Sequence, residues 1–163
     1  MLHRYLIALG SNRRHPCHGD PRRVLAAAIT TLERDGLRLL ACSRAIASAP
    51  LGPSLRRYAN AAILVESDLG PEAMLDCLQD VERRFGRTRR GQRWGPRVLD
   101  LDIVLWSGGT WAVPGLTVPH PEFRKRDFVL RPALDVAAHW RDPITAQSLR
   151  QLHTRLTRPR PLP

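Results

Sequence analysis

The run from Val98 to Trp106, V-L-D-L-D-I-V-L-W, constrains the fold more than any other part of the sequence. Its residues alternate with a period of two, which predicts a β-strand with two different faces. One face is aliphatic and would lie in the core: Leu99, Leu101, Ile103 and Leu105. The other face includes two carboxylates: Val98, Asp100, Asp102, Val104 and Trp106. The pattern therefore predicts a strand with an aliphatic face and a second face that has two aspartates.

Asp100 and Asp102 would lie about 7 Å apart along this strand. At an effective dielectric constant of about 20, their repulsion costs roughly 2 kcal/mol, and each carboxylate also loses hydration. A fold keeps such a pair when positive charge lies between the two groups. Arginine side chains could provide that charge, or a hard divalent cation that prefers oxygen ligands could do so.

The segment before the strand, residues 86–97, is rich in glycine and arginine. Gly86, Gly91, Gly95 and Pro96, which disfavour regular structure, are interspersed with the cations Arg87, Arg89, Arg90, Arg93 and Arg97. We expect a mobile loop that leads directly into the two carboxylates and becomes ordered when ligands bind. A cationic loop next to paired carboxylates fits a ligand made of a metal ion and a polyphosphate.

Composition restricts the class of protein. The chain has 163 residues, 43% of them hydrophobic, which predicts a single domain over residues 1–163 with a frayed tail at 156–163. It has no apolar run of about 20 residues, and its three cysteines lack paired spacing. We therefore expect a cytoplasmic protein with reduced thiols. The net charge of +11 indicates an anionic partner: nucleic acid, nucleotide or phosphorylated metabolite. Neither a P-loop nor G-x-G-x-x-G is present, so nucleotide binding would need another architecture.

Strand-like and helix-like segments alternate irregularly, which predicts a mixed sheet covered by helices. Strands are expected at residues 3–9, 37–47, 58–65, 98–106 and 113–118. Helices are expected at 21–35, with Asp20 as N-cap, at 72–85, at 122–126 and around 146–155. The His15-Cys17-His18 segment is interpreted as a loop, because no second ligand cluster lies at a usable spacing.

Asn60 interrupts an otherwise apolar strand, and a buried amide without partners costs about 1–3 kcal/mol. A neighbouring backbone group could satisfy it. Alternatively, its donor and acceptor could read a flat heterocycle. The residue alone does not decide between these interpretations.

Several motifs occur together in one order: G-S-N after the first strand, P-L-G-P, Y-A-N-A, G-R-T-R, R-W-G-P-R-V-L-D-L-D-I, and V-P-H-P followed by R-D-F-V-L. Over about residues 4–138 the chain thereby resembles the 6-hydroxymethyl-7,8-dihydropterin pyrophosphokinases of folate biosynthesis. The resemblance implies a ferredoxin-like three-layer α/β sandwich, with a mixed, mostly antiparallel sheet and flexible loops at the active site. It also implies an ATP-dependent enzyme with two Mg²⁺ ions, which transfers pyrophosphate to the pterin hydroxymethyl group and releases AMP.

The resemblance also assigns roles to residues. Metal binding falls on Asp100 and Asp102, and catalysis on these two together with Arg87 and Arg97. ATP contacts fall on Gln79, Glu82, Arg87, Arg89, Trp94, Arg97, Ile103, His120 and Arg126. Pterin contacts fall on Ser48, Leu51, Tyr58, Asn60, Trp94 and Phe128. The implied partners are the two small-molecule substrates, without nucleic acid or membrane, and the chain is expected to act as a monomer.

Two other functions compete with this interpretation. The first is a basic nucleic-acid-binding domain, but Asp100 and Asp102 would repel a phosphate backbone unless metals intervened. The second is a metal-dependent phosphotransferase or nucleotidyltransferase for another hydroxymethyl heterocycle. Ile46, Ser48 and Leu55 differ from residues common in the resembled family, and these differences keep the second alternative open.

Overall fold

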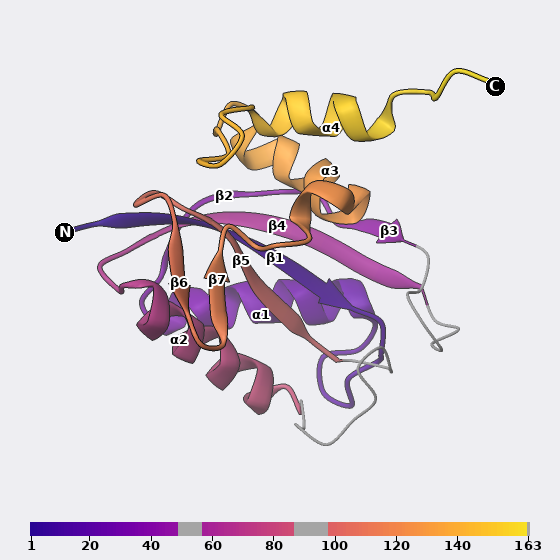
Figure 1. Cartoon of the computed structure of the whole chain (residues 1–163). Helices are drawn as coiled ribbons and strands as arrows, with labels where there is room; N and C mark the ends of the chain where they lie inside the picture. Colours follow the sequence, from indigo (N-terminus) through magenta and orange to yellow (C-terminus); the bar gives the residue numbers. More distant parts are fainter. Residues whose placement is uncertain (49–56, 87–97, 163) are drawn as a thin grey trace.

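The computed structural model describes residues 1–48, 57–86 and 98–162. Within these ranges the main sheet has five strands in the order β2-β4-β1-β5, and β3 also pairs with β4 (Figure 1). The strands are β1 (His3–Ser11), β2 (Arg38–Cys42), β3 (Ile46–Ser48), β4 (Tyr58–Ser67) and β5 (Asp100–Trp106). Each of these pairings is antiparallel. A separate hairpin is formed by β6 (Trp111–Val113) and β7 (Leu116–Val118).

Helices cover both faces of the main sheet (Figure 1). Helices α1 (Pro21–Arg34) and α2 (Pro71–Arg84) lie on one face, and α3 (Asp127–Ala137) lies on the other with α4 (Leu149–Thr157) packed outside it. A short 3₁₀-helix, η1 (Phe123–Lys125), contacts both α3 and α4. The architecture is the predicted ferredoxin-like three-layer sandwich. In the described part of the chain, no helix is long and apolar enough to cross a bilayer.

Each face of the sheet has its own hydrophobic core. The core beneath α1 and α2 includes fully buried residues of β1, β4 and the two helices, among them Ile7, Ile63, Val24, Leu32, Met74 and Leu78. The core beneath α3 and α4 includes Leu6, Ala62, Leu105, Phe123, Leu130 and Leu149. Helix α1 begins as predicted, since the Asp20 side chain accepts from the backbone N–H of Arg23. The sheet is therefore packed on both of its faces.

The predicted strand at 37–47 is wrong in one respect, since it is split into β2 and β3. The physical cause is Ser43. Its backbone N–H donates to the Ala62 carbonyl at 2.9 Å, and its side-chain oxygen accepts from the Ala62 N–H at 2.8 Å. The side chain takes the place of a backbone carbonyl in the ladder, so the strand is interrupted there.

The predicted alternation along β5 holds from Leu99 to Val104 and then fails. Leu6 pairs with Leu105, but the next residue, Ile7, pairs with Ile103, so Val104 forms a bulge. A bulge adds one residue to a strand and shifts its alternation. Leu105 consequently joins the core beneath α3, while Trp106 packs against the core beneath α1. Val98 precedes the strand and also packs against the core beneath α1, so the predicted faces of these three residues were wrong.

The predicted strand at 113–118 is also wrong, since it spans the end of β6, a turn and β7. The remaining predictions concern loops and ends. The segment expected to be mobile, residues 86–97, lies outside the described residues except for Gly86, and residues 49–56 are not described either. Helix α4 runs to Thr157, into the segment expected to be a tail. Cys17, Cys42 and Cys77 are free thiols. In the His15–His18 loop, the backbone N–H of Cys17 donates to His15 Nδ1 at 3.0 Å, and the His18 ring stacks on Phe85.

Candidate active site

The candidate site is centred on Gly10, near the end of the central strand β1. Gly10 pairs with Asn60 of β4 on one side and with Asp100 of β5 on the other. Directly paired residues of an antiparallel sheet point to the same face. The carboxylate and the amide therefore face each other across a glycine, with Cα atoms about 10 Å apart, or two strand spacings.

The next row toward the middle of the sheet repeats this arrangement. Ala8 lies between Ala62 of β4 and Asp102 of β5. Gly10 and Ala8 are small, so they form a shallow floor flanked by carboxylates on one side. A side chain at position 10 would meet Asn60 Oδ1 at 3.4 Å and Tyr58 Cδ1 at 3.6 Å. The absence of a side chain at Gly10 therefore keeps this floor open.

The two aspartates fit a hard divalent cation. They lie on one face of β5, Asp100 half-buried and Asp102 exposed. Among the described residues, no group of three or more His, Cys, Asp and Glu side chains could hold a metal ion. A protein site with only two carboxylates suits Mg²⁺, which keeps several waters and takes further ligands from phosphate groups.

On the other side of the floor, Asn60 is buried and has a side-chain partner. Its exposed fraction is 4%, and its Nδ2 donates to Ser48 Oγ at 2.6 Å. Neither interpretation of Asn60 from the sequence included this hydroxyl. The bond joins β3 to β4 and fixes the amide plane, so that Oδ1 is directed toward the floor at Gly10. Tyr58, also on β4, borders the same floor.

His120 and Arg126 approach the carboxylates from the segment that links β7 to α3. The His120 backbone N–H donates to the Val104 carbonyl at 3.0 Å, which fixes the histidine beside β5. Burial lowers the pKa of His120, while the negative charge of Asp102 raises it and the positive charge of Arg126 lowers it further. These three side chains are thus close enough to interact. His120 Nδ1 accepts from the Glu122 N–H at 3.1 Å, so the neutral ring has its proton on Nε2 and can donate it to a phosphate.

Phe128 lies at the start of α3, next to the same group. The Arg126 guanidinium is 5.8 Å from the centre of the Phe128 ring, within the range of a cation–π contact. The resemblance assigns Arg126 to ATP binding and Phe128 to pterin binding, so this contact links the two sets of residues. The two assigned binding regions are therefore adjacent at the N-terminus of α3.

Glu82 has a different environment from the one expected for a nucleotide contact. Its side chain is only 4% exposed, and Oε2 accepts from the Leu101 N–H at 3.0 Å. Leu101 lies between the two aspartates on β5, which is an edge strand. The carboxylate therefore replaces a strand partner and holds the outer edge of β5 in place.

The other assigned residues are distributed as follows. The Ile103 side chain is buried in the core beneath α1, so only its backbone on β5 could contact a nucleotide. Gln79 is half-buried on α2. The remaining assigned residues lie outside the described part of the chain: Leu51, Arg87, Arg89, Trp94 and Arg97.

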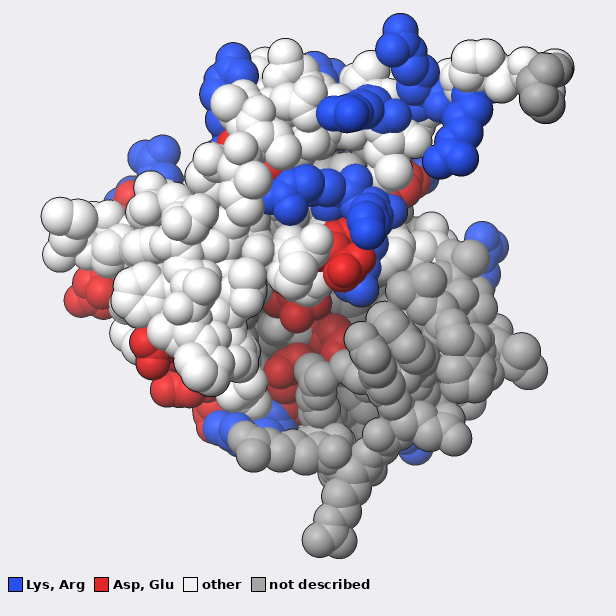
Figure 2. All heavy atoms as spheres, viewed as in Figure 1, with Lys and Arg blue, Asp and Glu red and all other residues white. Residues whose placement is uncertain are grey.

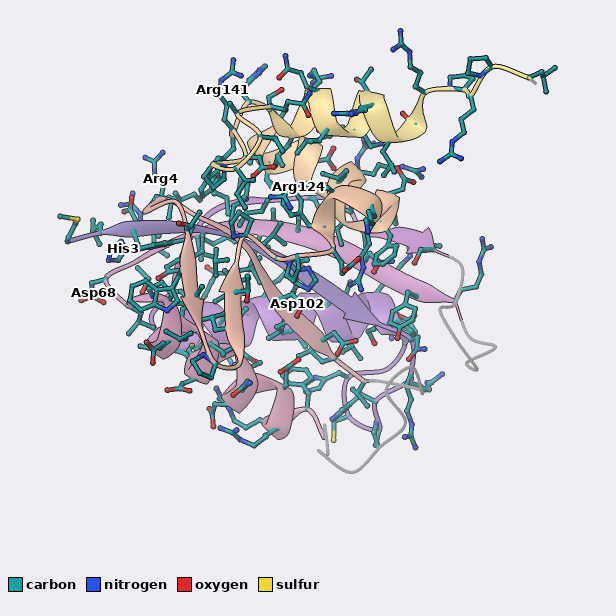
Figure 3. The ribbon with its side chains drawn as sticks, in the orientation of Figure 1. His3, Arg4, Asp68, Asp102, Arg124 and Arg141 are labelled. Atoms are coloured by element: carbon teal, nitrogen blue, oxygen red, sulfur yellow. The ribbon has the colours of Figure 1, made fainter. Side chains whose placement is uncertain are left out.

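The surface supports a site for a charged ligand at this place. Figure 2 shows acidic residues in a hollow in the middle of the viewed face, with Lys and Arg side chains above it. Asp102 lies in the middle of the same view, and Arg124 lies above it (Figure 3). Negative and positive groups next to each other suit a metal–polyphosphate better than a bare anion.

Sequence reasoning missed two features of this site. Gly10 was expected to end the first strand, but β1 continues through Ser11, and the glycine forms the floor. The pair of Arg124 and Asp142, described below, was not recognised, because nothing in the sequence indicates that these two positions meet.

Comparisons with known proteins agree with the geometry. A family model for 7,8-dihydro-6-hydroxymethylpterin-pyrophosphokinase (HPPK) matches residues 6–138. A Pseudomonas aeruginosa protein named 2-amino-4-hydroxy-6-hydroxymethyldihydropteridine pyrophosphokinase is 41% identical over 145 residues, 88% of this chain and 86% of that protein. A Haemophilus influenzae protein of the same name is 37% identical over 134 residues, 81% of this chain and 80% of that protein.

A solved structure of Plasmodium falciparum HPPK-DHPS has a similar fold, with a TM-score of 0.72 at 10% identity. The similarity covers 95% of this chain but 44% of that longer chain, and at this identity it shows the fold alone. The sequence matches are more specific, since they include the strand with both aspartates and the segment with His120 and Arg126. The chain therefore belongs to the 7,8-dihydro-6-hydroxymethylpterin-pyrophosphokinase family.

Proposed function

We propose that this protein transfers the pyrophosphoryl group of ATP to the hydroxymethyl group of 6-hydroxymethyl-7,8-dihydropterin and releases AMP, as a step of folate biosynthesis. The observation that carries the proposal is the row of Asn60, Gly10 and Asp100 across three neighbouring strands. It places an amide suited to a heterocycle opposite a carboxylate suited to a metal–phosphate. We propose that the reacting groups of both substrates meet over Gly10, between these two side chains.

The pterin would lie on the β4 side of the floor. The bond from Asn60 Nδ2 to Ser48 Oγ keeps the amide from rotating, so its oxygen can accept from a ring or amino N–H of the pterin. Tyr58 and Phe128 offer aromatic surfaces for packing against the ring. The contact of Phe128 with Arg126 would place the hydroxymethyl end close to the phosphate-binding groups.

The triphosphate would lie on the β5 side, between the aspartates and the segment that links β7 to α3. His120 would donate from Nε2, and Arg126 would offer a cation that remains charged. We propose that Asp100 and Asp102 hold two Mg²⁺ ions, which would offset the charge of the phosphates during transfer. The arginines of residues 87–97 would add contacts to ATP, and Trp94 would close over the site.

The reaction balances without a cofactor that stays on the protein. The hydroxymethyl oxygen forms a bond to the β-phosphorus, and the bond from that phosphorus to the α–β bridging oxygen breaks. AMP leaves with the bridging oxygen, and the alcohol proton passes to solvent. The residues named here act by orientation and charge, because a primary alcohol held in line with the leaving oxygen loses its proton late. We propose that the protein acts as a monomer in the reducing cytoplasm.

The test is a comparison of acceptors with purified protein, ATP and Mg²⁺. We expect nucleotide turnover that requires the reduced pterin, with one AMP formed for each pterin consumed. Hydroxymethyl heterocycles without the pterin amide and amino groups should give no turnover, because Asn60 would lose its partner. Faster turnover with such a heterocycle would reject the pterin as substrate and favour a different phosphotransferase. ADP as the pterin-dependent product would reject pyrophosphoryl transfer.

A further inference from the structure

The strongest unexplained interaction in the described chain joins η1 to the turn before α4. Arg124 Nε and Nη2 donate to the two carboxylate oxygens of Asp142 at 2.5 and 2.8 Å. Asp142 is completely buried, and it follows residues 6–138, the region matched by the family model. A two-point bond between an arginine and a buried carboxylate fixes both position and orientation.

From this geometry we propose that Arg124 and Asp142 are positioning residues that hold His120 and Arg126 against Asp102 for nucleotide binding. The inference rests on the proposed function of those residues. We treat Arg124 as a positioning residue because two of its three guanidinium nitrogens, Nε and Nη2, are bonded to Asp142. Its effect would pass through the two residues on either side of η1.

The turn that contains Asp142 is itself firmly held. Asp142 also accepts from the Ile144 N–H at 3.0 Å and from the Thr145 hydroxyl at 2.8 Å. Its own backbone N–H donates to the Gln147 carbonyl at 2.8 Å. Directly after the turn, Ser148 and Gln151 form a capping box that starts α4. The carboxylate is therefore a fixed point in the turn before α4 rather than a surface group that follows the arginine.

The segment that Arg124 anchors has the two phosphate-binding candidates at its ends. His120 lies just before η1, and Arg126 directly follows it. Phe123 is fully buried beneath the Arg124 guanidinium, which lies 4.6 Å from the ring centre. The Arg126 N–H donates to the Phe123 carbonyl at 3.3 Å. A rotation of η1 would thus move Arg126 directly, and it would change the orientation of the His120 ring through the Glu122 N–H that donates to His120 Nδ1.

A pair that only stabilised the fold would show the same contacts. The test must therefore separate an effect on the position of His120 and Arg126 from an effect on the stability of the protein. Arg124→Lys keeps the positive charge but cannot form the two-point bond. The variant is made in the wild-type background and in a background with both His120→Ala and Arg126→Ala. For each protein we measure the Kd of a non-hydrolysable ATP analogue with Mg²⁺, kcat/KM for ATP, and Tm.

In the wild-type background we expect Arg124→Lys to weaken analogue binding and lower kcat/KM roughly tenfold to a hundredfold, as expected for misplaced contacts. In the background without His120 and Arg126, the same change should alter the Kd by less than about twofold. The decrease in Tm should be the same in both backgrounds. Leu32→Ala is the matched control, because Leu32 is a buried residue of α1, on the other face of the sheet. It should lower Tm without changing kcat/KM.

Equal fold-losses of binding in the two backgrounds would overturn the proposal and leave a purely structural role. Unchanged binding and kcat/KM in Arg124→Lys would overturn it as well. If Arg124→Lys does not fold, Asp142→Asn replaces it, since the amide oxygen still accepts from the Ile144 N–H and the amide NH2 can donate to the Thr145 hydroxyl. If the proposed function is wrong, the wild-type protein will show no pterin-dependent turnover. Binding of the ATP analogue would still test the role of the Arg124–Asp142 pair in that case.

Discussion

Replacing Gly10 with alanine should separate stability from activity. Glycine inside a strand costs about 0.5–1 kcal/mol relative to alanine, because the unfolded chain loses more freedom on folding. The added methyl group would lie 3.4 Å from Asn60 Oδ1 and 3.6 Å from Tyr58 Cδ1, which is van der Waals contact without overlap. We therefore expect the free energy of unfolding to rise by up to about 1 kcal/mol, or roughly 2–4 °C in Tm.

The same methyl group should impair the enzyme. It would stand on the floor between Asp100 and Asn60, where the substrates have to meet. An extra methyl group in a fitted pocket costs about 1–3 kcal/mol of binding, so kcat/KM for the pterin should fall roughly tenfold or more. Gly10→Val should lose both activity and stability, since its branches would press on the Asn60 amide and the Tyr58 ring.

The assay combines urea unfolding with steady-state kinetics in which pterin and ATP are varied separately. Gly70→Ala is a suitable control for kinetics, because a side chain at Gly70 would meet nothing within 4 Å. Unchanged kcat/KM for the pterin in Gly10→Ala would refute the floor as part of the site. A loss of stability above about 1 kcal/mol would refute the geometry around Asn60.

Three further predictions concern acidic residues. Replacing Asp100 or Asp102 with alanine should remove at least about 3 kcal/mol of transition-state stabilisation while the fold survives, and near-normal kcat at saturating Mg²⁺ would reject the metal assignment. Glu82→Ala should cost about 1–3 kcal/mol in urea unfolding, because a strand N–H loses its partner, whereas Glu82→Gln keeps an acceptor and should cost less. Burial raises the pKa of Asp142, but the hydrogen bonds that it accepts, first from Arg124, outweigh burial and lower it below the ordinary 3.8. The folded carboxylate then binds fewer protons than the unfolded one. Its contribution to the free energy of unfolding is therefore present above about pH 3.8 and is lost as pH falls through the folded pKa. Asp142→Asn should lack this loss at acid pH when unfolding is measured against pH.

Local patterns predicted much of the fold and part of the arrangement of the candidate site. The alternation around Asp100 and Asp102 placed both on one face of a strand, because side-chain direction in a strand follows from spacing alone. Asp20 likewise started its helix where predicted. The quoted motifs indicated His120 and Arg126, and the structure brings both close to Asp102.

What could not be predicted depends on contacts between distant parts of the chain. The bulge at Val104 arises from pairing with β1, and the interruption at Ser43 arises from its bonds to Ala62. Similarly, the partner of Glu82 is a backbone group of another element. The sequence contains these residues but no local pattern that shows which of them meet.

The central claim is that two phosphorus atoms leave ATP together, and ³¹P NMR of a complete reaction tests it most directly. ATP, Mg²⁺ and the reduced pterin are incubated with the purified protein, and the products are followed until the pterin is consumed. We expect an AMP singlet together with two mutually coupled signals of a diphosphate ester on the pterin, with AMP and the ester in equal amounts. A singlet from a pterin monophosphate, with the two coupled signals of ADP, would contradict it.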